Sequence, residues 1–479
     1  MKKYLMYIGG NWCNAIDGKE KDVISPVNGE LIGQIALGSS KDVNAAVAAA
    51  KAAESRLALM SVFDRAVMLK RVANAIDTRS EELSHLLTCE HGKTLKEALG
   101  EVKGTAEYFR EAAEQIKWME SGTIPAVHSG KRVLSYRRPL GTTAVITPWN
   151  FPIGCPGGYY LPYLLAAGDP FIWNPATSTA AVASAFMQCF EDAEVPVGFA
   201  NLVIGTGREV GTALTIHPDI AAIGFTGSTE AGRAISAGAG LKHTVMELGG
   251  NGPCIVMKDA DLELAAEELM SGAFSNAGQI CTSTERVLAD ESIADELAGI
   301  IRSKMSNYRL GDPFDPTVNV GPMHKAETID IVKEHIEDAL QKGASLLEGG
   351  QLRTDMPTHN YMEPTLLDHV SRDSLLNKEE TFGPVIPIIR YKNENELPEI
   401  IADSDYRLFA AIFTRDITKA LQMADRMKFG TININSSTHY WEPDFPAGGG
   451  AGSASGYGRS GGKWSIEDFT EIRNITIRV

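Results

Sequence analysis

One cysteine lies in surroundings that suit catalysis. Cys281 follows a helix-like run from Leu264 to Phe274, and the residues next to it include Gly278, Thr282 and Ser283. Such small or polar neighbours leave room for a second molecule, whereas large apolar side chains usually enclose a structural cysteine and keep its thiol inert. A small core-filling residue is the alternative interpretation. The sequence favours a thiol that acts as a nucleophile.

Two polar side chains at the ends of strand-like segments could assist this thiol. Glu247 precedes Gly249 and Gly250, and these glycines let the backbone approach a ligand closely. At this position Glu247 could act as a base that activates water to attack a thioester on the thiol. Asn150 lies in a loop bracketed by prolines, where its amide could donate to an oxyanion, a contact worth roughly 2.7–4 kcal/mol. The alternatives are a satisfied carboxylate at a sheet edge for Glu247 and a capping role for Asn150.

A third segment, Phe225–Gly232, combines a strand, a glycine turn and the start of a helix. Backbone N–H groups at such a helix start suit a phosphate, so Gly227 and Ser228 are candidate phosphate contacts. The glycines of Gly205–Gly211 resemble a dinucleotide fingerprint, but their final spacing differs and no acid follows at the expected strand end. The cofactor is therefore not assigned to them.

From Gly141 onward, strand-like and helix-like segments alternate. The strand-like ones are 143–146, 171–173, 201–204, 221–225 and 244–247, with helical runs such as 179–192 and 229–237 between them. A second series has strands near 254–257, 286–289, 385–391, 409–413 and 431–434. This alternation predicts an α/β fold of two doubly wound sheets, with ligands bound beyond the carboxyl ends of the strands.

Two further stretches carry structural predictions. Helix is expected from Ser80 to Met119, with interruptions at Gly92 and Gly100. The segment Ala447–Gly462 has eight glycines in sixteen residues, so we expect a flexible loop or linker before a last strand at Ile472–Arg478.

Composition excludes several classes of protein. The 479 residues are too many for one simple core, and a net charge of −16 disfavours binding to nucleic acids or anionic membranes. No signal peptide is expected, and no apolar run reaches the ~18–20 residues of a membrane span. The six cysteines are too widely spread for a disulfide framework, so we predict a cytoplasmic location. Neither the cysteines nor the ten histidines show metal-ligand spacing, so we predict no metal.

Taken together, five segments resemble the aldehyde dehydrogenase superfamily, and the likeness covers essentially the whole chain. They are Pro148–Pro152, Phe225–Thr229, Glu247–Gly250, Gly278–Cys281 and Glu379–Pro384. The resemblance implies a hydrolytic enzyme that oxidises an aldehyde to a carboxylic acid with NAD or NADP. It implies that Cys281 attacks the carbonyl, that Asn150 and the N–H of Cys281 hold the oxyanion, and that Glu247 activates water to hydrolyse the thioester.

The same resemblance implies the cofactor contacts. Glu380 would hold the nicotinamide ribose and Phe382 would pack beside the ring. Asn174 stands where the family usually has a lysine, and Thr177 where NAD-preferring members often have a glutamate, so a 2′-phosphate is neither attracted nor repelled and both cofactors stay open. The predicted cofactor-binding set is Trp149, Asn174, Thr177, Gly227, Ser228, Gly249, Glu380 and Phe382.

The segment after Asn150 departs from many relatives. Gly and Cys replace bulky side chains there, and Tyr159 stands where a lysine is common. Our hypothesis is an enlarged tunnel for a bulky or aromatic aldehyde, and the Ser455–Lys463 stretch is similar to members acting on aromatic aldehydes. The predicted substrate pocket comprises Phe151, Cys155, Gly158, Ile280 and Thr282.

The family's architecture also implies a division of the chain. We expect a Rossmann-like cofactor domain, a catalytic domain and a small β-hairpin arm for oligomerisation. Their predicted bounds are 1–120 with 140–249 and a returning loop at 447–460, then 250–446, and then 121–139 with 461–479. The hairpin turns at Ser129–Gly130 and has few partners nearby in sequence, which fits a homodimer or homotetramer.

Two other functions stay open. A CoA-acylating relative would resolve the thioester with a thiol, but such enzymes typically lack the base that Glu247 supplies. A catalytically idle binding or structural protein is disfavoured by the intact catalytic set, whereas Asn174 and Tyr159 keep it under consideration.

Overall fold

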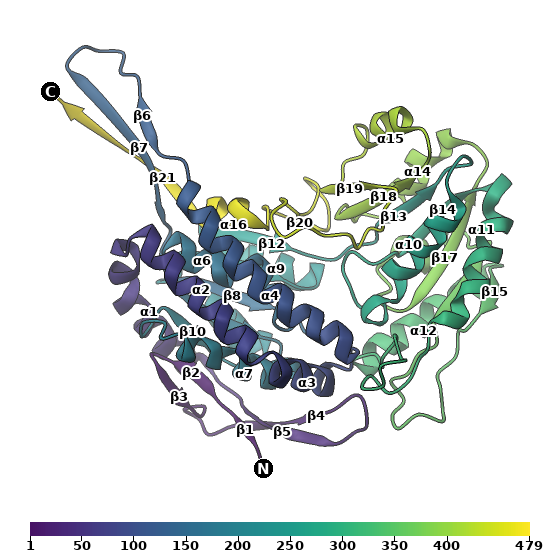
Figure 1. Cartoon of the computed structure of the whole chain (residues 1–479), viewed down its shortest axis with the longest axis horizontal. Coiled ribbons are helices and arrows are strands. Elements are labelled where there is room, and N and C mark those ends of the chain that lie inside the picture. The colour runs from purple at the N-terminus through teal and green to yellow at the C-terminus, as the bar shows by residue number, and fades with distance from the viewer.

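The computed structural model covers all 479 residues and contains two large sheets, each with its own hydrophobic core. In Figure 1 the N-terminal half forms one lobe, the green segments form a second, and a three-stranded arm projects from the first. The predicted α/β fold class is confirmed, while the predicted domain bounds stay a prediction.

The first lobe is built on an eight-stranded sheet. In spatial order its strands are β20 (Gly456–Tyr457), β12 (His243–Glu247), β11 (Ala222–Thr226), β8 (Thr143–Thr147), β9 (Phe171–Pro175), β10 (Ala200–Leu202), β2 (Met6–Ile8) and β3 (Asn11–Cys13). The strands from β12 to β10 are parallel and almost wholly buried, as expected when helices cover both faces. The loops after β8, β9, β11 and β12 therefore meet at one edge.

Helices and a small sheet complete this lobe. The helices are α1 (Ser40–Leu59), α2 (Val62–Thr78), α3 (Ser80–His91), α4 (Leu95–Gln115), α5 (Gly154–Tyr159), α6 (Leu161–Ala167), α7 (Ala180–Asp192), α8 (Thr212–Ile216), α9 (Thr229–Ala239) and α16 (Gly462–Asp468). The small sheet has β1 (Lys3–Tyr4), β5 (Leu31–Ala36) and β4 (Glu20–Ile24).

The predicted helix break at Gly100 is wrong, whereas the break at Gly92 is confirmed. Gly92 has φ 100° and ends α3 in the left-handed conformation. Helix α4 starts at a capping box formed by Thr94 and Glu97 and continues through Gly100. A helical glycine costs about 1 kcal/mol relative to alanine, and the buried face of α4 outweighs that penalty.

The second lobe is built on a seven-stranded sheet. Its strands are β15 (Ser345–Glu348), β16 (Thr365–Asp368), β17 (Val385–Tyr391), β14 (Arg286–Asp290), β13 (Pro253–Val256), β18 (Phe409–Phe413) and β19 (Thr431–Ile434). All neighbours are parallel except β15. The helices are α10 (Leu262–Phe274), α11 (Glu291–Lys304), α12 (Ala326–Gln341), α13 (Leu375–Lys378), α14 (Leu397–Ala402) and α15 (Ile417–Ala424).

The arm is an antiparallel sheet of β6 (Gly122–Ile124), β7 (Lys131–Pro139) and β21 (Thr470–Arg478). The predicted hairpin turn at Ser129–Gly130 is confirmed, with Gly130 at φ 79°, and the first strand of the hairpin is β6. The C-terminal strand pairs along its whole length with β7, and the pair extends away from the lobe (Figure 1). Several apolar side chains of this arm face solvent, including Ile124, Ile472 and Ile475.

The segment Ala447–Gly462 is not the flexible linker that its glycines predicted. Its backbone returns to the first sheet, where β20 pairs with β12. Ala447 and Ser460 exchange two backbone hydrogen bonds of 2.9 and 2.8 Å. A Cβ atom at Gly456 would lie 2.0 Å from the carbonyl oxygen of Met246. The glycines therefore serve close packing against the strand rather than flexibility.

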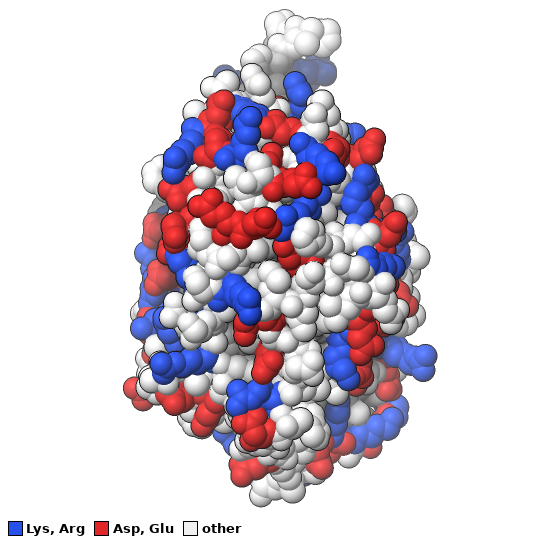
Figure 2. Space-filling view, turned by 90° about the vertical axis from the view of Figure 1, so that its right-hand side faces the viewer, with Lys and Arg blue, Asp and Glu red and all other residues white.

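The surface charge is mixed in sign. Figure 2 shows acidic and basic side chains interspersed over the face of the second lobe, without an extended patch of one sign. No helix has the length and apolar content needed to span a membrane.

Candidate active site

Cys281 lies on a strained turn that follows α10. Asn276, Ala277 and Gly278 have consecutive positive φ angles of 52°, 53° and 74°. A left-handed conformation in a residue other than glycine costs about 1–3 kcal/mol and persists only where its surroundings hold it. The turn therefore depends on contacts from other parts of the chain.

Those contacts join the thiol turn to the loop of Asn150. The backbone N–H of Asn276 donates to Glu97 Oε1 at 2.7 Å, and its side-chain Nδ2 donates to the carbonyl oxygen of Asn150 at 3.1 Å. In return, Asn150 Nδ2 donates to the carbonyl oxygen of Gln279 at 3.0 Å. The side chain of Gln279 closes the turn on Asn276 at 2.9 Å. Two of the three predicted catalytic residues, Cys281 and Asn150, thus lie on one hydrogen-bonded unit.

Glycines let the backbone at this point approach closely. A Cβ atom at Gly250 would lie 1.9 Å from the carbonyl oxygen of Cys281, and one at Gly278 would lie 2.1 Å from that of Gly383. The strand end after Glu247 therefore packs directly against the thiol turn.

A buried ion pair fixes the Asn150 loop from the other side. Lys93 Nζ lies 2.6 Å from Glu101 Oε2 and donates to the carbonyl oxygen of Asn150 at 3.0 Å. Glu101 Oε1 accepts from the backbone N–H groups of Ile153 and Gly154 at 3.1 and 2.8 Å. No local pattern in the sequence indicates this pair, because its members contact segments 52 to 57 residues away along the chain.

A cavity of about 370 Å³ opens beside the thiol. Its wall contains Cys281, Asn150 and all five residues of the predicted substrate pocket, Phe151, Cys155, Gly158, Ile280 and Thr282. Further lining residues, beyond the predicted pocket, include Lys93, Glu97, Tyr108, Tyr159, His439 and Trp441.

The expected enlargement at Gly158 is not seen. A Cβ atom there would lie 3.1 Å from the ring of Tyr108, so this ring fills the space that the missing side chain leaves. Gly100 and Gly104 on α4 also line the cavity, and a Cβ atom at either would meet nothing within 4 Å. The open space lies along α4 instead.

Glu247 is buried, with 4% of its surface exposed. Burial raises the pKa of its carboxyl to about 8, against the lowering effects of a hydrogen bond from Ser460 and of the charge of Arg459. Burial raises the pKa of the Cys281 thiol, and the negative charges of Glu380 and Glu247 raise it further. The resting thiol is therefore protonated, and its activation requires a proton acceptor.

An aromatic cluster lies at the same edge of the first sheet. The ring of Trp149 stacks on His324 at 4.9 Å and meets Phe382 edge-on at 5.6 Å. Phe382 has φ 57° and is held by Glu285, which accepts from its N–H at 3.0 Å. Glu380 Oε1 accepts from the N–H of Gly250 at 2.7 Å.

Comparison with known proteins identifies this arrangement. Residues 12–475 match the aldehyde dehydrogenase family. The chain belongs to the aldehyde dehydrogenase family. The predicted enzyme class, an NAD(P)-dependent aldehyde dehydrogenase, and the predicted cofactor, NAD or NADP, are thereby confirmed.

Several relatives are similar over almost their whole length. The succinate-semialdehyde dehydrogenase [NADP(+)] of Escherichia coli (strain K12) is 35% identical over 98% of this chain and 97% of its own. The lactaldehyde dehydrogenase of Methanocaldococcus jannaschii is 35% identical over 98% of this chain and 100% of its own. The crystal structure of an E. coli NADP-dependent enzyme superposes with a TM-score of 0.96, at 34% identity over 100% of this chain and 98% of that one.

For an aldehyde dehydrogenase, the predicted cofactor contacts lie at the expected strand ends. Ser228 caps α9, where its Oγ accepts from the N–H of Ala231 at 3.3 Å. A Cβ atom at Gly249 would lie 2.9 Å from Glu380 Oε2, so glycine is needed beside this carboxylate. Gly227 lies in the turn between β11 and α9, directly before Ser228. A helix N-terminus that follows a glycine turn suits a phosphate of a dinucleotide.

The amide of Asn174, a predicted cofactor contact, is partly engaged within the chain. Both hydrogens of its amide are bonded within the chain, to the carbonyl oxygens of Val203 and Gly205 at 3.0 Å each. Only its oxygen is left for a ribose. Thr177 lies nearby in sequence, and its Oγ1 accepts from Lys21 Nζ at 3.3 Å.

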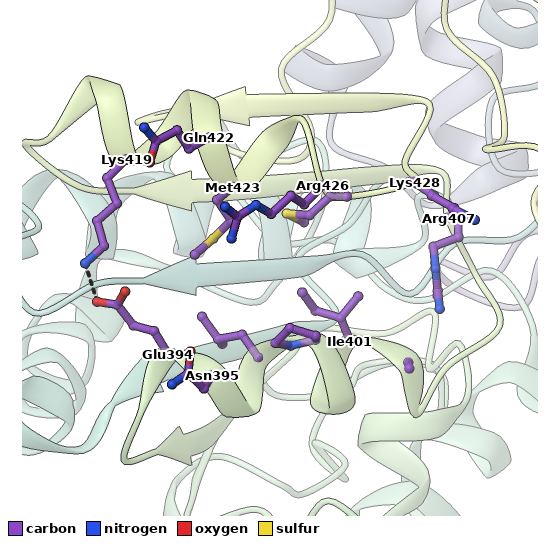
Figure 3. Close-up of a pocket in the computed structure, with 13 residues that line it drawn as sticks. Glu394, Asn395, Ile401, Arg407, Lys419, Gln422, Met423, Arg426 and Lys428 are labelled. Carbon is purple, nitrogen blue, oxygen red and sulfur yellow. Dashed lines mark hydrogen bonds and ion pairs between the residues drawn. The ribbon is translucent and has the colours of Figure 1, made fainter.

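A second cavity of this aldehyde dehydrogenase, of about 490 Å³, lies between α14 and α15. Figure 3 shows Lys419 paired with Glu394 across its rim, and Met423 and Ile401 within it. It contains none of the predicted site residues, and so it is not the site of the chemistry.

Proposed function

We propose that this protein oxidises a bulky, uncharged aldehyde to its carboxylic acid through a thioester on Cys281. The observation that carries the proposal is the cavity whose lining includes Cys281, Asn150 and several aromatic rings. The Cys281 sulfur forms a bond to the carbonyl carbon, and its proton leaves to a base or to water. The carbonyl oxygen becomes an oxyanion.

Asn150 would stabilise this oxyanion. Its Nδ2 carries two hydrogens, and one of them already donates to the carbonyl oxygen of Gln279. The other is free to donate, and the hydrogen bond through Gln279 holds the amide on the thiol turn. A donor that is fixed before the reaction stabilises the developing charge without reorganisation.

Ser228, Trp149, Glu380 and Phe382 would hold the cofactor. When bound, NAD(P)+ supplies the acceptor for the two electrons and the hydrogen that leave the carbonyl carbon. Glu285 holds the backbone of Thr381 and Phe382 through both carboxylate oxygens at 3.0 Å each, so the Phe382 ring is fixed in advance.

Glu247 would act as the base that resolves the thioester. Its carboxylate takes a proton from water, the water oxygen bonds to the acyl carbon, and the carbon–sulfur bond breaks to return the Cys281 thiolate. Because burial raises the pKa of Glu247 to about 8, the ionised fraction and hence the rate of this step rise with pH between about 7 and 9.

The wall of the cavity favours a substrate without a carboxylate. Lys93 is its one cationic side chain, and the ion pair with Glu101 already neutralises this charge. Glu97 adds a further acidic group. The E. coli relative is named for an aldehyde that carries a carboxylate, but the cavity wall of this chain has no unpaired cationic side chain to bind such a group. The rings of Tyr108, Phe151, Tyr159 and Trp441 suit an aromatic aldehyde instead.

Lys21 favours NADP at the adenosine end. Its Nζ donates to Oγ1 of Thr177, which lies three residues after the position where the family usually has a lysine. Burial lowers the pKa of Lys325, the charge of Glu327 raises it, and the charge of Lys21 lowers it. The ammonium group of Lys21 would attract a 2′-phosphate. The names of the E. coli relative and of the similar crystal structure include NADP.

We also propose a cytoplasmic homo-oligomer assembled through the arm. Ile472 is 61% and Ile124 48% exposed on strands that extend from the lobe. A second subunit would cover such exposed apolar strands. All six cysteines are free, in line with a reducing compartment.

The test is reduction of the cofactor, read at the absorbance of the reduced nicotinamide. The wild-type protein and Cys281→Ala would be incubated with NAD or NADP and a panel of benzaldehydes, short aliphatic aldehydes and semialdehydes. We expect the wild type to prefer benzaldehydes and Cys281→Ala to be inactive. Preference for a semialdehyde that carries a carboxylate would contradict the substrate proposal, and an active Cys281→Ala would contradict the mechanism.

A further inference from the structure

The glycine-rich segment holds one hydroxyl group against the proposed base. Ser460 is buried, and its Oγ lies 3.0 Å from Glu247 Oε1. An ionised carboxylate has no hydrogen to give, so the hydroxyl donates. This is the one side-chain hydrogen bond that the Glu247 carboxylate receives, and its other oxygen, Oε2, has no protein donor.

The backbone of the segment is shaped for this approach. The paired hydrogen bonds between Ala447 and Ser460 close it into a loop. Gly448, inside that loop, has φ 158°, and a Cβ atom there would lie 3.3 Å from Glu247 Oε1 and 2.5 Å from the carbonyl oxygen of Gly458. A side chain at position 448 would therefore push the loop away from the carboxylate.

Few charges face Glu247 from the elements around it. Arg459 favours the ionised carboxylate, although its guanidinium is bonded to the carbonyl oxygens of Gly449 and Gly458. Asp468 on α16 opposes ionisation. The remaining titratable neighbours are neutral groups with raised pKa values, Cys281 on the thiol turn and Cys155, Tyr159 and Tyr160 beside it.

We propose that Ser460 is a positioning residue for the base: its hydroxyl favours the ionised carboxylate of Glu247 and leaves Oε2 as the oxygen that receives the proton from water. This inference rests on the proposed role of Glu247 in resolving the thioester. It gives the glycine-rich segment a function, because the segment carries Ser460 back across the sheet to β12.

The experiment compares Ser460→Ala with Ser460→Thr, which keeps the hydroxyl. A hydrogen bond to a charged group changes an ionisation midpoint by about one to two pH units. From a midpoint of about 8, Ser460→Ala should therefore lower the steady-state rate at pH 8 by about 5- to 50-fold, with recovery at higher pH. The first turnover of reduced cofactor, which precedes hydrolysis, should keep its amplitude. Ser460→Thr should resemble the wild type.

Ser453→Ala is the matched control, because this serine of the same segment donates to the carbonyl oxygen of Gly450 at 2.7 Å rather than to Glu247. An unchanged pH midpoint in Ser460→Ala would overturn the inference. Should Ser460→Ala fail to fold, Ser460→Cys, a weaker donor, must shift the midpoint in the same direction, and no shift would overturn the inference equally. A wild-type protein that reduces neither cofactor would contradict the proposed function instead.

Discussion

Glu101→Gln tests whether the buried ion pair holds the oxyanion loop. Lys93 and Glu101 are 1% and 2% exposed in their side chains, with nitrogen and oxygen 2.6 Å apart. Removing one member of such a pair leaves a buried charge uncompensated, which costs about 3–5 kcal/mol of the free energy of unfolding. The glutamine oxygen can still accept from the N–H groups of Ile153 and Gly154, but its amino group would face the Lys93 ammonium.

The loss should extend to catalysis. Lys93 Nζ donates to the carbonyl oxygen of Asn150, so a displaced ammonium releases the loop that carries the oxyanion donor. A misplacement of about 1 Å can cost on the order of 100-fold in kcat. Lys93→Met combined with Glu101→Gln leaves no buried charge, and it should recover most of the stability but not kcat.

The assay is urea unfolding of the wild type, both single variants and the double variant, with kcat measured on the same preparations. The cycle of four proteins isolates the coupling between the two side chains. A loss below about 1 kcal/mol in the free energy of unfolding of Glu101→Gln, together with wild-type kcat, would refute the reasoning. Breaking a buried ion pair must lower the free energy of unfolding, because it leaves a charge without its partner.

Three further outcomes are expected. Asn150→Ala should lower kcat by about 10²–10³-fold while binding of the cofactor changes little; a loss below about fivefold in kcat would remove Asn150 from the oxyanion site. Glu247→Gln should produce one equivalent of reduced cofactor per site and then stall in stopped-flow measurements, and continued turnover at the wild-type rate would exclude it as the base. Lys21→Ala should raise KM for NADP by about tenfold and leave KM for NAD unchanged, since it removes one charge near a 2′-phosphate; equal effects on both cofactors would contradict the NADP proposal.

Local sequence predicted the parts of the site that lie at strand ends. Cys281, Glu247 and Asn150 each stand in a short motif whose glycines or prolines are needed at that point of the backbone, and the structure brings their segments together. The alternation of apolar strands and helices predicted both sheets, because fully buried parallel strands have few other interpretations.

Contacts between distant segments could not be predicted in this way. Ser460 meets Glu247 across 213 residues, and no periodicity in either segment signals it. The glycines around Ser460 indicated flexibility, since composition does not distinguish a mobile loop from one packed against a strand. Gly158 indicated an enlarged tunnel, but Tyr108 from α4 fills that space.

The central claim is that the Cys281 sulfur becomes acylated. Glu247→Gln incubated with a benzaldehyde and NADP would be digested and examined by mass spectrometry for a peptide that carries the acyl group. We expect one aroyl group per chain, on the peptide containing Cys281, and none in the double variant that combines Glu247→Gln with Cys281→Ala. Cofactor reduction without any adduct, or an adduct on Cys155 instead, would contradict it.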